Sequence, residues 1–161
     1  MTVIVDTGFL SSLVKIGRVD LIQAFFPDQN TVIPEQVFAE LKRSDIITEA
    51  LPALFTDTSG EEAFIEIRDY DLAYEHPGLG RGERACIDLC GGHDIILMDD
   101  RDAKRAAHDE GKACFDLPTF LYACKKNGLL DEDSVETVIQ DLREEDHYRF
   151  TEDVENLLLE G

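Results

Sequence analysis

Short runs of aliphatic and β-branched residues alternate along the chain with segments whose apolar residues recur every three to four positions. The runs predict strands at residues 2–5, 31–33, 64–68, 95–98 and 113–115. The segments between them predict helices at residues 9–16, 21–26, 35–43, 83–90, 101–110 and 117–127. This alternation favours a three-layer α/β/α domain built on a parallel sheet.

Proline and glycine mark several of the expected helix boundaries. Pro34 is expected at the first position of the helix that continues over 35–43, because a missing backbone N–H is tolerated there. Gly111 and Gly128 are expected to end the helices that precede them. Residues 44–55 form a weaker helical pattern, and residues 56–62 are polar and turn-like.

The acidic end of the chain predicts two further helices, at about 134–145 and 152–160. The inner face of the first would carry Val135, Val138, Ile139 and Leu142. No linker or repeat divides the chain. We therefore expect a domain at 1–130 and an acidic helical C-terminal extension at 131–161 packed on that same domain.

Charge and length narrow the class of protein. With 161 residues the chain fits one domain, and 35 acidic against 15 basic residues give a net charge of −20. Half of this net charge lies in residues 131–161, and it opposes unassisted binding to a polyanion. Such acidity suggests a halophilic protein of a salt-rich cytoplasm. Without a leader or an apolar run of membrane-spanning length, a cytoplasmic location is expected.

Acidic residues recur where the predicted strands end or the following helices begin. Parallel strands place their carboxyl ends at one edge of the sheet, so these acids should meet there. Repulsion among clustered carboxylates is commonly offset by a divalent cation, and an all-oxygen set suits Mg²⁺ or Mn²⁺. Metal ions at such a site favour phosphodiester hydrolysis. The acids concerned are Asp6, Glu40, Glu83, Asp99, Asp100 and, less clearly, Asp116.

Helical periodicity shows which acids lie on or beside the apolar face of their helix and are therefore candidates for the site. Glu83 shares a helix face with Cys86 and Cys90, and an acid on an apolar face needs a partner. Glu40 lies at the border of the apolar face of its own helix. Each acid also has a purely structural interpretation as a strand-end cap or a solvated helix residue.

The four cysteines, Cys86, Cys90, Cys114 and Cys124, are expected to be small buried residues. A zinc site made of Cys86, Cys90 and His93 is a weak alternative, because no fourth ligand has a motif spacing.

Four segments, at 5–10, 33–41, 79–89 and 97–107, resemble the successive motifs of PIN-domain nucleases, particularly the VapC-like branch. The resemblance runs from residue 2 to about 130. It implies a short twisted parallel sheet and a metal-dependent endoribonuclease. It also implies a homodimer and, in many members, the toxin of a toxin–antitoxin pair with a small antitoxin protein as partner.

Carried over by position, the resemblance assigns the site residues. Asp6 matches the first acid, Glu40 the second, and Glu83 the third, where Asp is more frequent. The fourth acid is Asp99 or Asp100. Further candidates are Thr7, which matches the small hydroxyl residue after the first acid, together with Asp102 and Asp116, the latter either a ligand or a helix N-cap.

Binding of RNA phosphates next to this acidic centre requires positively charged side chains nearby. Basic residues close in sequence to Glu83 and Asp99 could form a rim that contacts RNA phosphates, and the alternative is a set of solvated helix charges. They are Arg81, Arg84, Arg101, Lys104 and Arg105.

Three other functions remain open at this point. A housekeeping nuclease of the same fold would act in RNA maturation or decay. A haloacid-dehalogenase-type phosphatase also begins with an apolar strand ending in Asp, but Gly8 stands where its second acid would be. A catalytically silent PIN-like binding module would keep the fold without the reaction.

Overall fold

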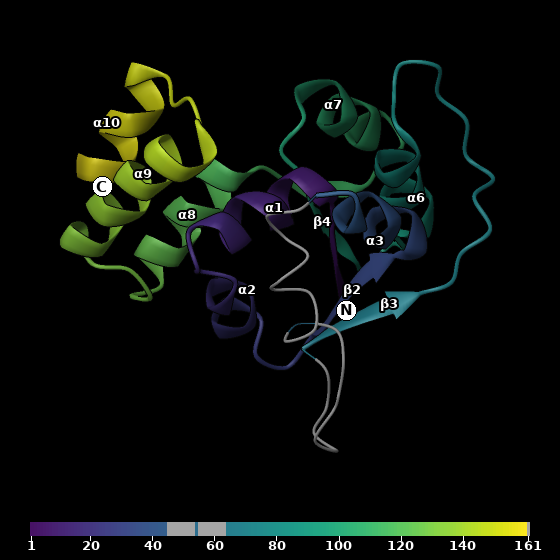
Figure 1. The fold of residues 1–161 in the computed structure, drawn as a ribbon, viewed down its shortest axis with the longest axis horizontal. Helices are drawn as coiled ribbons and strands as arrows, with labels where there is room; N and C mark the ends of the chain where they lie inside the picture. Colours follow the sequence, from purple (N-terminus) through teal and green to yellow (C-terminus); the bar gives the residue numbers. More distant parts are fainter. Residues whose placement is uncertain (45–53, 55–63, 161) are drawn as a thin grey trace.

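A parallel sheet forms the centre of the molecule in the computed structural model, which describes residues 1–44, 54 and 64–160 (Figure 1). In the described residues its strand order is β3-β2-β1-β4-β5, and every neighbouring pair is parallel. The strands are β1 (Thr2–Val5), β2 (Asn30–Pro34), β3 (Ile65–Arg68), β4 (Ile95–Leu97) and β5 (Ala113–Phe115). The predicted sheet is thus confirmed. The weak helix expected at 44–55 and the turn at 56–62 lie, apart from Ser44 and Leu54, outside the described residues.

Helices follow the strands as the periodicity predicts. Their bounds are α1 (Thr7–Lys15), α2 (Asp20–Phe25), α3 (Glu35–Lys42), α6 (Arg81–Leu89), α7 (Arg101–Asp109), α8 (Leu117–Lys126), α9 (Glu132–Asp146) and α10 (Glu152–Glu160). Side-chain caps begin three of them: Asp100 accepts from the N–H of Ala103, Asp116 from Thr119 and Asp131 from Ser134.

Several helices and strands begin or end one or two residues away from the sequence expectation, and two of these differences have an identifiable structural context. Pro34 is not the first helical residue: it ends β2 and stands before α3 in an extended conformation, φ −68° and ψ 156°. Pairing of Pro34 with Arg68 of β3 extends β2 and delays the helix by one residue. Helix α6 begins at Arg81, two residues before Glu83, so Glu83 lies inside its first turn. Gly111 and Gly128 follow α7 and α8 with φ of 73° and 77°, as expected of helix-ending glycines.

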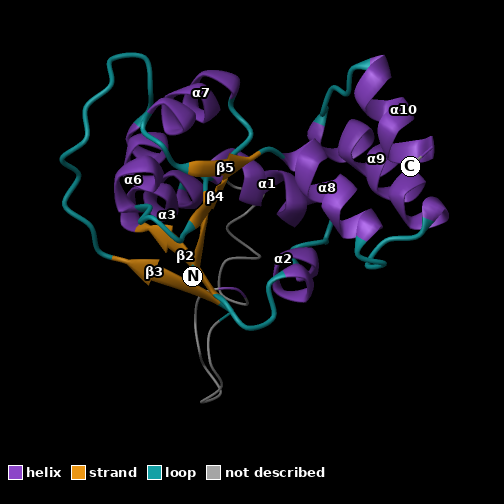
Figure 2. Cartoon of the chain, turned by 180° about the vertical axis from the view of Figure 1, so that it is seen from behind, coloured by secondary structure: helices purple, strands orange, loops and turns teal. Residues whose placement is uncertain are grey.

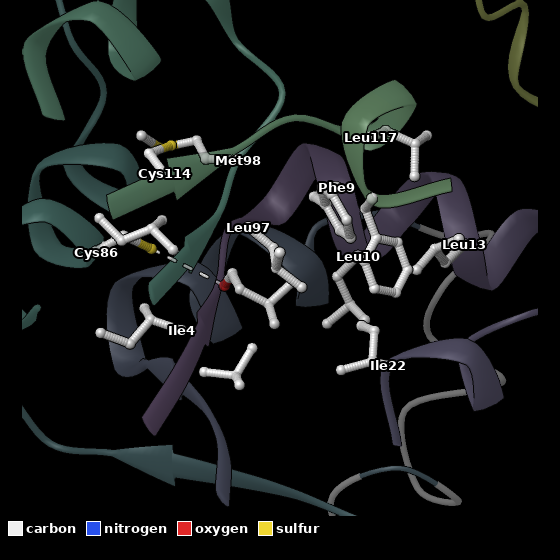
Figure 3. Close-up of a cluster of buried hydrophobic side chains, with 14 of the residues drawn as sticks. Ile4, Phe9, Leu10, Leu13, Ile22, Cys86, Leu97, Met98, Cys114 and Leu117 are labelled. Atoms are coloured by element: carbon white, nitrogen blue, oxygen red, sulfur yellow. Dashed lines mark hydrogen bonds between the residues drawn. The ribbon is translucent and has the colours of Figure 1, made fainter. Parts of the chain in front are cut away.

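The two faces of the sheet are covered by different helices. Figures 1 and 2 show α6 and α7 on one side and α1, α2 and α8 on the other, with α3 packed beside α6. Figure 3 shows the side chains that fill both layers: Ile4 lies with Cys86 and Met98, whereas Phe9, Leu13 and Ile22 pack on the opposite face. The buried strands hold the start of each following helix in a fixed place.

The C-terminal helices share this core. Helix α9 packs against α1 and α8, and α10 packs against α8 and α9. Val135, Val138, Ile139 and Leu142 are buried as predicted, and the ammonium group of Lys125 on α8 donates to Leu158 O at 2.7 Å. Within the described ranges, the structure contains no helix with the length and apolarity needed to span a bilayer.

Candidate active site

Asp6 occupies the centre of the candidate site because it directly follows the central strand β1. Its backbone N–H donates to Leu97 O at 2.9 Å, which continues the pairing of β1 with β4. The residue is 5% exposed, and its Oδ1 is buried without a hydrogen-bond partner in the part of the chain that the structure describes. Burial raises the pKa of Asp6 to about 7; the Thr7 amide opposes this, and Glu83, Glu40 and Asp100 add to it. An acid in this state favours a cation at its free oxygen.

Two hydrogen bonds hold the Glu40 carboxylate beside Asp6. The Thr7 hydroxyl donates to Glu40 Oε2, and the backbone N–H of Gly82 donates to Oε1 at 3.0 Å. Glycine at position 82 allows this approach, since a Cβ atom there would stand 2.6 Å from Oε2. Thr7 therefore orients Glu40, and this carboxylate connects α3 to the first turns of α1 and α6.

Glu83 and Asp100 belong to the N-terminal ends of α6 and α7. Glu83 is half-buried, and its pKa is raised by burial first and then by the charge of Asp100. Asp100 is exposed and uses Oδ1 to accept from Ala103 N at 2.9 Å. The partial positive charge at the N-terminus of each helix reduces the repulsion between the two acids. Asp102, in the first turn of α7, is exposed, and its charge also raises the pKa of Glu83.

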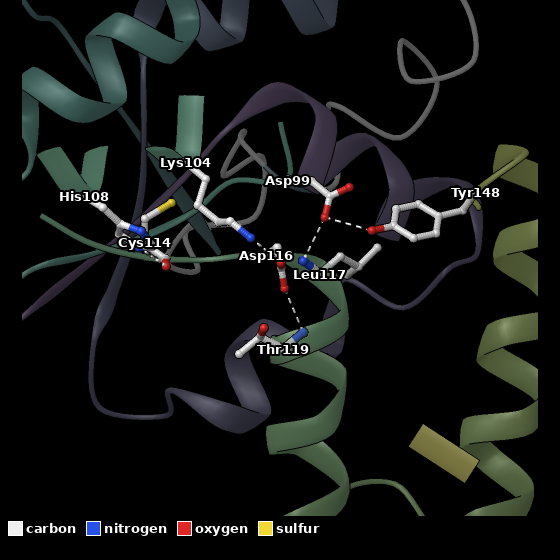
Figure 4. Close-up of polar contacts among 8 residues, drawn as sticks. All are labelled: Asp99, Lys104, His108, Cys114, Asp116, Leu117, Thr119 and Tyr148. Atoms are coloured by element: carbon white, nitrogen blue, oxygen red, sulfur yellow. Dashed lines mark hydrogen bonds and ion pairs between the residues drawn. The ribbon is translucent and has the colours of Figure 1, made fainter. Parts of the chain in front are cut away.

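Asp99 points into a different network, shown in Figure 4. Its Oδ1 accepts from the backbone N–H of Leu117 and from the hydroxyl of Tyr148, each at 2.9 Å. Burial is the main reason that the pKa of Asp99 is raised. Asp99 therefore ties β4 to α8 and to the C-terminal part of the chain.

Asp116 is a helix cap with an ion pair. Its Oδ1 accepts from Thr119 N at 2.9 Å, and its Oδ2 lies 2.6 Å from Lys104 Nζ. Burial opposes ionisation, but the bonds from Lys104 and Thr119 outweigh it and lower the pKa of Asp116. The N-cap interpretation of Asp116 is confirmed.

One cleft of about 600 Å³ collects the strand-end acids. Its lining consists of Asp6, Thr7, Gly8, Ser11, Ser12, Lys15, Glu40, Glu83, Asp99, Asp100, Asp146, His147, Tyr148 and Arg149. Across residues 1–44, 54 and 64–160, no three His, Cys, Asp or Glu side chains converge closely enough to hold a metal ion. Like charges repel, and Glu40, Asp99 and Asp100 each bond a backbone N–H; both effects keep the carboxylates apart.

The basic residues chosen from the sequence are not part of this lining. Arg81 borders a second cleft next to α3, Arg84 donates to Gly80 O at 3.4 Å, and Lys104 pairs with Asp116. Arg101 and Arg105 are exposed on α7. The basic side chains that do line the acidic cleft come from elsewhere in the chain: Lys15, His147 and Arg149.

Sequence reasoning did not anticipate the contribution of residues 146–149. The acidic tail hides a signal that could have identified them: His147, Tyr148, Arg149 and Phe150 form a stretch without acids between two amphipathic helices. Nothing in the sequence marks Lys15 as a residue of the cleft, because the residues around it show only the ordinary periodicity of a helix.

The cysteines behave as small buried side chains. All four are free and buried, and burial raises the pKa of Cys114 and Cys124 to about 12, so both stay as thiols. Cys90 Sγ contacts the carbonyl oxygens of Gly91 and Asp94 at 3.5 and 3.6 Å. The described residues contain no zinc site at Cys86, Cys90 and His93.

Comparison with protein families identifies the family of the chain. A family model described as a PIN domain matches residues 2–160, which includes the C-terminal helices as well as the segment in which the resemblance was first noted. No curated protein and no solved structure matches the chain significantly.

Proposed function

The chain belongs to the PIN-domain family, a family of nucleases, and we propose that it is a metal-dependent endoribonuclease. The observation that carries the proposal is the cleft that Asp6, Glu40, Glu83 and Asp100 line together, with Asp6 Oδ1 buried and without a partner among the described residues. The four acids come from four separate βα units, and the resemblance matches each of them by position to an acid of the family's site, with Asp100 as one of two candidates for the fourth.

The donor set fits a hard divalent cation. The acids and hydroxyl residues that line the cleft with Asp6 offer oxygen donors, which suit Mg²⁺ or Mn²⁺ better than zinc. Asp6, Glu83 and Asp100 would hold the ion, and Asp99 could offer its second oxygen. When bound, the ion would supply an activated water and charge stabilisation for phosphodiester hydrolysis.

The chain's own residues would prepare this site in three ways. Thr7 and the Gly82 amide hold Glu40 in one orientation, so that its carboxylate is ready to accept a proton from the attacking water. Burial around Asp6 excludes bulk water and strengthens its interaction with a cation. The first turns of α6 and α7 carry Glu83 and Asp100 toward the cleft on rigid elements.

The structure favours Asp100 over Asp99 as the fourth acid. The charge of Asp100 raises the pKa of both Asp6 and Glu83, whereas Asp99 is bonded to Leu117 and Tyr148. Asp100→Asn should therefore lower the affinity for Mn²⁺ by about 10-fold or more, because it removes a ligand charge. Asp99→Asn should lower the melting temperature more and the affinity less. Calorimetric Mn²⁺ titration and thermal melts measure both, and the reverse ranking would assign the role to Asp99.

The activity itself is tested by incubating the purified protein with end-labelled single-stranded RNA and with DNA of the same sequence, in Mg²⁺, in Mn²⁺ and in EDTA. Internal cleavage of RNA that needs the metal is the expected result. Cleavage of DNA alone would change the substrate class. Metal binding without cleavage of either would favour a silent binding module.

The same nuclease activity could serve a toxin with a small antitoxin partner or a housekeeping nuclease, and a separate experiment distinguishes these two roles. Growth arrest on expression of the parent, absent with Asp6→Asn, would support the toxin. A homodimer and a cytoplasmic location accompany either role in this proposal, and light scattering measures the former.

High salt should favour the stability and the RNA cleavage of this protein more than those of a nuclease with a small net charge. At −20 the chain repels both itself and RNA, and at 1 M salt the Debye length falls to about 3 Å. We expect the melting temperature to rise between 0.1 and about 2 M KCl, with RNA cleavage retained. Activity and melting temperature that both collapse by moderate salt would contradict a halophilic protein.

A further inference from the structure

The connection between α9 and α10 contributes part of the lining of the acidic cleft. Asp146, the last residue of α9, and the three residues after it line the same cleft as Asp6 and Glu83. We propose that Arg149, on this connection, binds the phosphate backbone of a single-stranded RNA whose neighbouring phosphodiester lies at the acids. This proposal rests on the proposed function and adds a substrate-binding residue to it.

The start of the connection is anchored on α1. Asp146 Oδ1 lies 2.9 Å from Lys15 Nζ, and Asp146 Oδ2 accepts from the Ser12 hydroxyl at 2.6 Å. Ser12 and Asp146 are separated by 134 residues in the sequence, and the Asp146 side chain is 10% exposed. An ion pair of such low exposure fixes the place at which the chain leaves α9.

The backbone then turns toward the cleft. His147 has φ 53° and ψ 32°, a left-handed conformation that glycine usually occupies, and the N–H of Tyr148 donates to Leu142 O at 3.0 Å. A left-handed residue at this position ends a helix and changes the direction of the chain, and histidine adopts this conformation more readily than most non-glycine residues. The turn directs the next two side chains back over the candidate site.

Contacts on both sides of Arg149 hold it there. The Tyr148 hydroxyl donates to Asp99 Oδ1 at 2.9 Å, as Figure 4 shows, and the Tyr148 and Phe150 rings lie 4.7 Å apart between centroids. The Arg143 guanidinium lies 5.9 Å from the Phe150 ring centroid. Tyr148 is thus a positioning residue, because it joins the connection to the strand end that carries Asp99 and Asp100.

Unlike Lys15 and Arg143, Arg149 has no side-chain partner in the part of the chain that the structure describes. Lys15 is paired with Asp146, and Arg143 is paired with Glu155. No hydrogen bond or ion pair within the described ranges involves the Arg149 side chain, which is exposed. In a chain so rich in carboxylates, an unpaired guanidinium at the mouth of an acidic cleft is available for an anion from outside. Its planar fork binds phosphate oxygens in pairs.

The binding test compares Arg149→Gln with Arg18→Gln. Both variants lose one positive charge, but Arg18 pairs with Asp20 on the surface and does not line the cleft. The probe is a fluorescein-labelled single-stranded RNA of about 12 nucleotides, within the span that such grooves bind. Anisotropy is measured over a salt series in the Asp6→Asn background, so that the probe stays intact. Arg149→Gln should weaken binding about 3- to 10-fold and reduce the slope of log K against log[salt] by about 0.7, the value for one contact to a single strand.

Kinetics in the otherwise unchanged protein give an independent readout. We expect Arg149→Gln to raise KM several-fold with little change in kcat, and to leave the Mn²⁺ affinity and the melting temperature as in the parent, since Arg149 contacts neither the acids nor the core. Binding and KM equal to those of Arg18→Gln would overturn the inference while leaving the nuclease proposal intact. A parent that cleaves no RNA but binds the probe through Arg149 would instead refute the nuclease proposal and keep the binding site. A parent that does not bind the probe overturns the inference.

Discussion

Asp6→Asn is expected to abolish metal-dependent RNA cleavage, by at least about 10³-fold, and yet to raise the melting temperature of the metal-free protein. Loss of this ligand removes charge stabilisation worth several kcal/mol in the transition state, and about 4 kcal/mol corresponds to 10³ in rate. The opposite effect on stability follows from the burial of a charge whose Oδ1 has no partner in the described structure.

The sign of the stability change depends on pH. The pKa of Asp6 is raised from 3.8 to about 7, so between these values the folded protein binds more protons than the unfolded chain. The free energy of unfolding therefore falls as pH rises through this window, by up to about 4 kcal/mol for this one group. An asparagine side chain cannot ionise, so the variant does not undergo this decrease in the free energy of unfolding. At pH 8 in EDTA the variant should be more stable by about 2 kcal/mol, or about 4–8 °C for a chain of this size.

Asp28→Asn is the matched control, because Asp28 is exposed and outside the cleft. It should change neither cleavage nor the pH dependence of melting. Cleavage by Asp6→Asn at the parental rate would remove Asp6 from the site. A lower melting temperature than the parent at pH 8 in EDTA would contradict the buried, unpartnered carboxylate.

Gly82→Ala should lower RNA cleavage by about 10- to 100-fold without unfolding the protein. The added Cβ would stand 2.6 and 2.8 Å from the two Glu40 carboxylate oxygens, which are the mobile end of a flexible side chain. Glu40 would turn away and lose the bonds from Thr7 and from the Gly82 N–H, and a displacement of about 1 Å in a catalytic group can cost 10² in rate. Alanine itself suits a helix better than glycine, by about 0.5–1 kcal/mol.

Gly80→Ala provides the comparison two residues earlier. Gly80 has an ordinary φ of −72°, and a Cβ there meets nothing within 4 Å. The cleavage rate of the Gly80→Ala variant should stay within about 3-fold of that of the parent, since loss of a glycine N-cap costs only modest stability. Equal rates for the Gly82→Ala and Gly80→Ala variants would mean that the orientation of Glu40 does not matter.

Local periodicity and turn chemistry were sufficient to predict the sheet. Val3 to Val5, Ile96 and Leu97 are buried apolar residues, and the acids after these strands lie at one edge of the sheet because adjacent parallel strands end together. Pro34 was misplaced because its pairing with Arg68 of β3 outweighs the helix-start preference of proline, and pairing partners are not visible in a local pattern.

The site was predicted only as far as strand ends and helix starts define it. Asp99 and Asp100 are neighbours in the sequence, but α8 and Tyr148 engage one of them and the first turn of α7 engages the other. Likewise, Arg149 reaches the cleft through an ion pair between residues 15 and 146. Contacts of this kind arise from tertiary packing, and neither strand nor helix periodicity carries information about them.

The joining of Ser12 and Lys15 to Asp146 has a consequence for biosynthesis. A ribosome releases Asp6 and the first helix long before it reaches Tyr148 and Arg149, and N-terminal parts of a chain begin to fold as they emerge. Asp6, Glu40, Glu83 and Asp100 are therefore all synthesised before the residues at 146–149 that complete the lining of the cleft. If the proposed role of Arg149 holds, a nascent chain that ends before this residue lacks its contact to RNA.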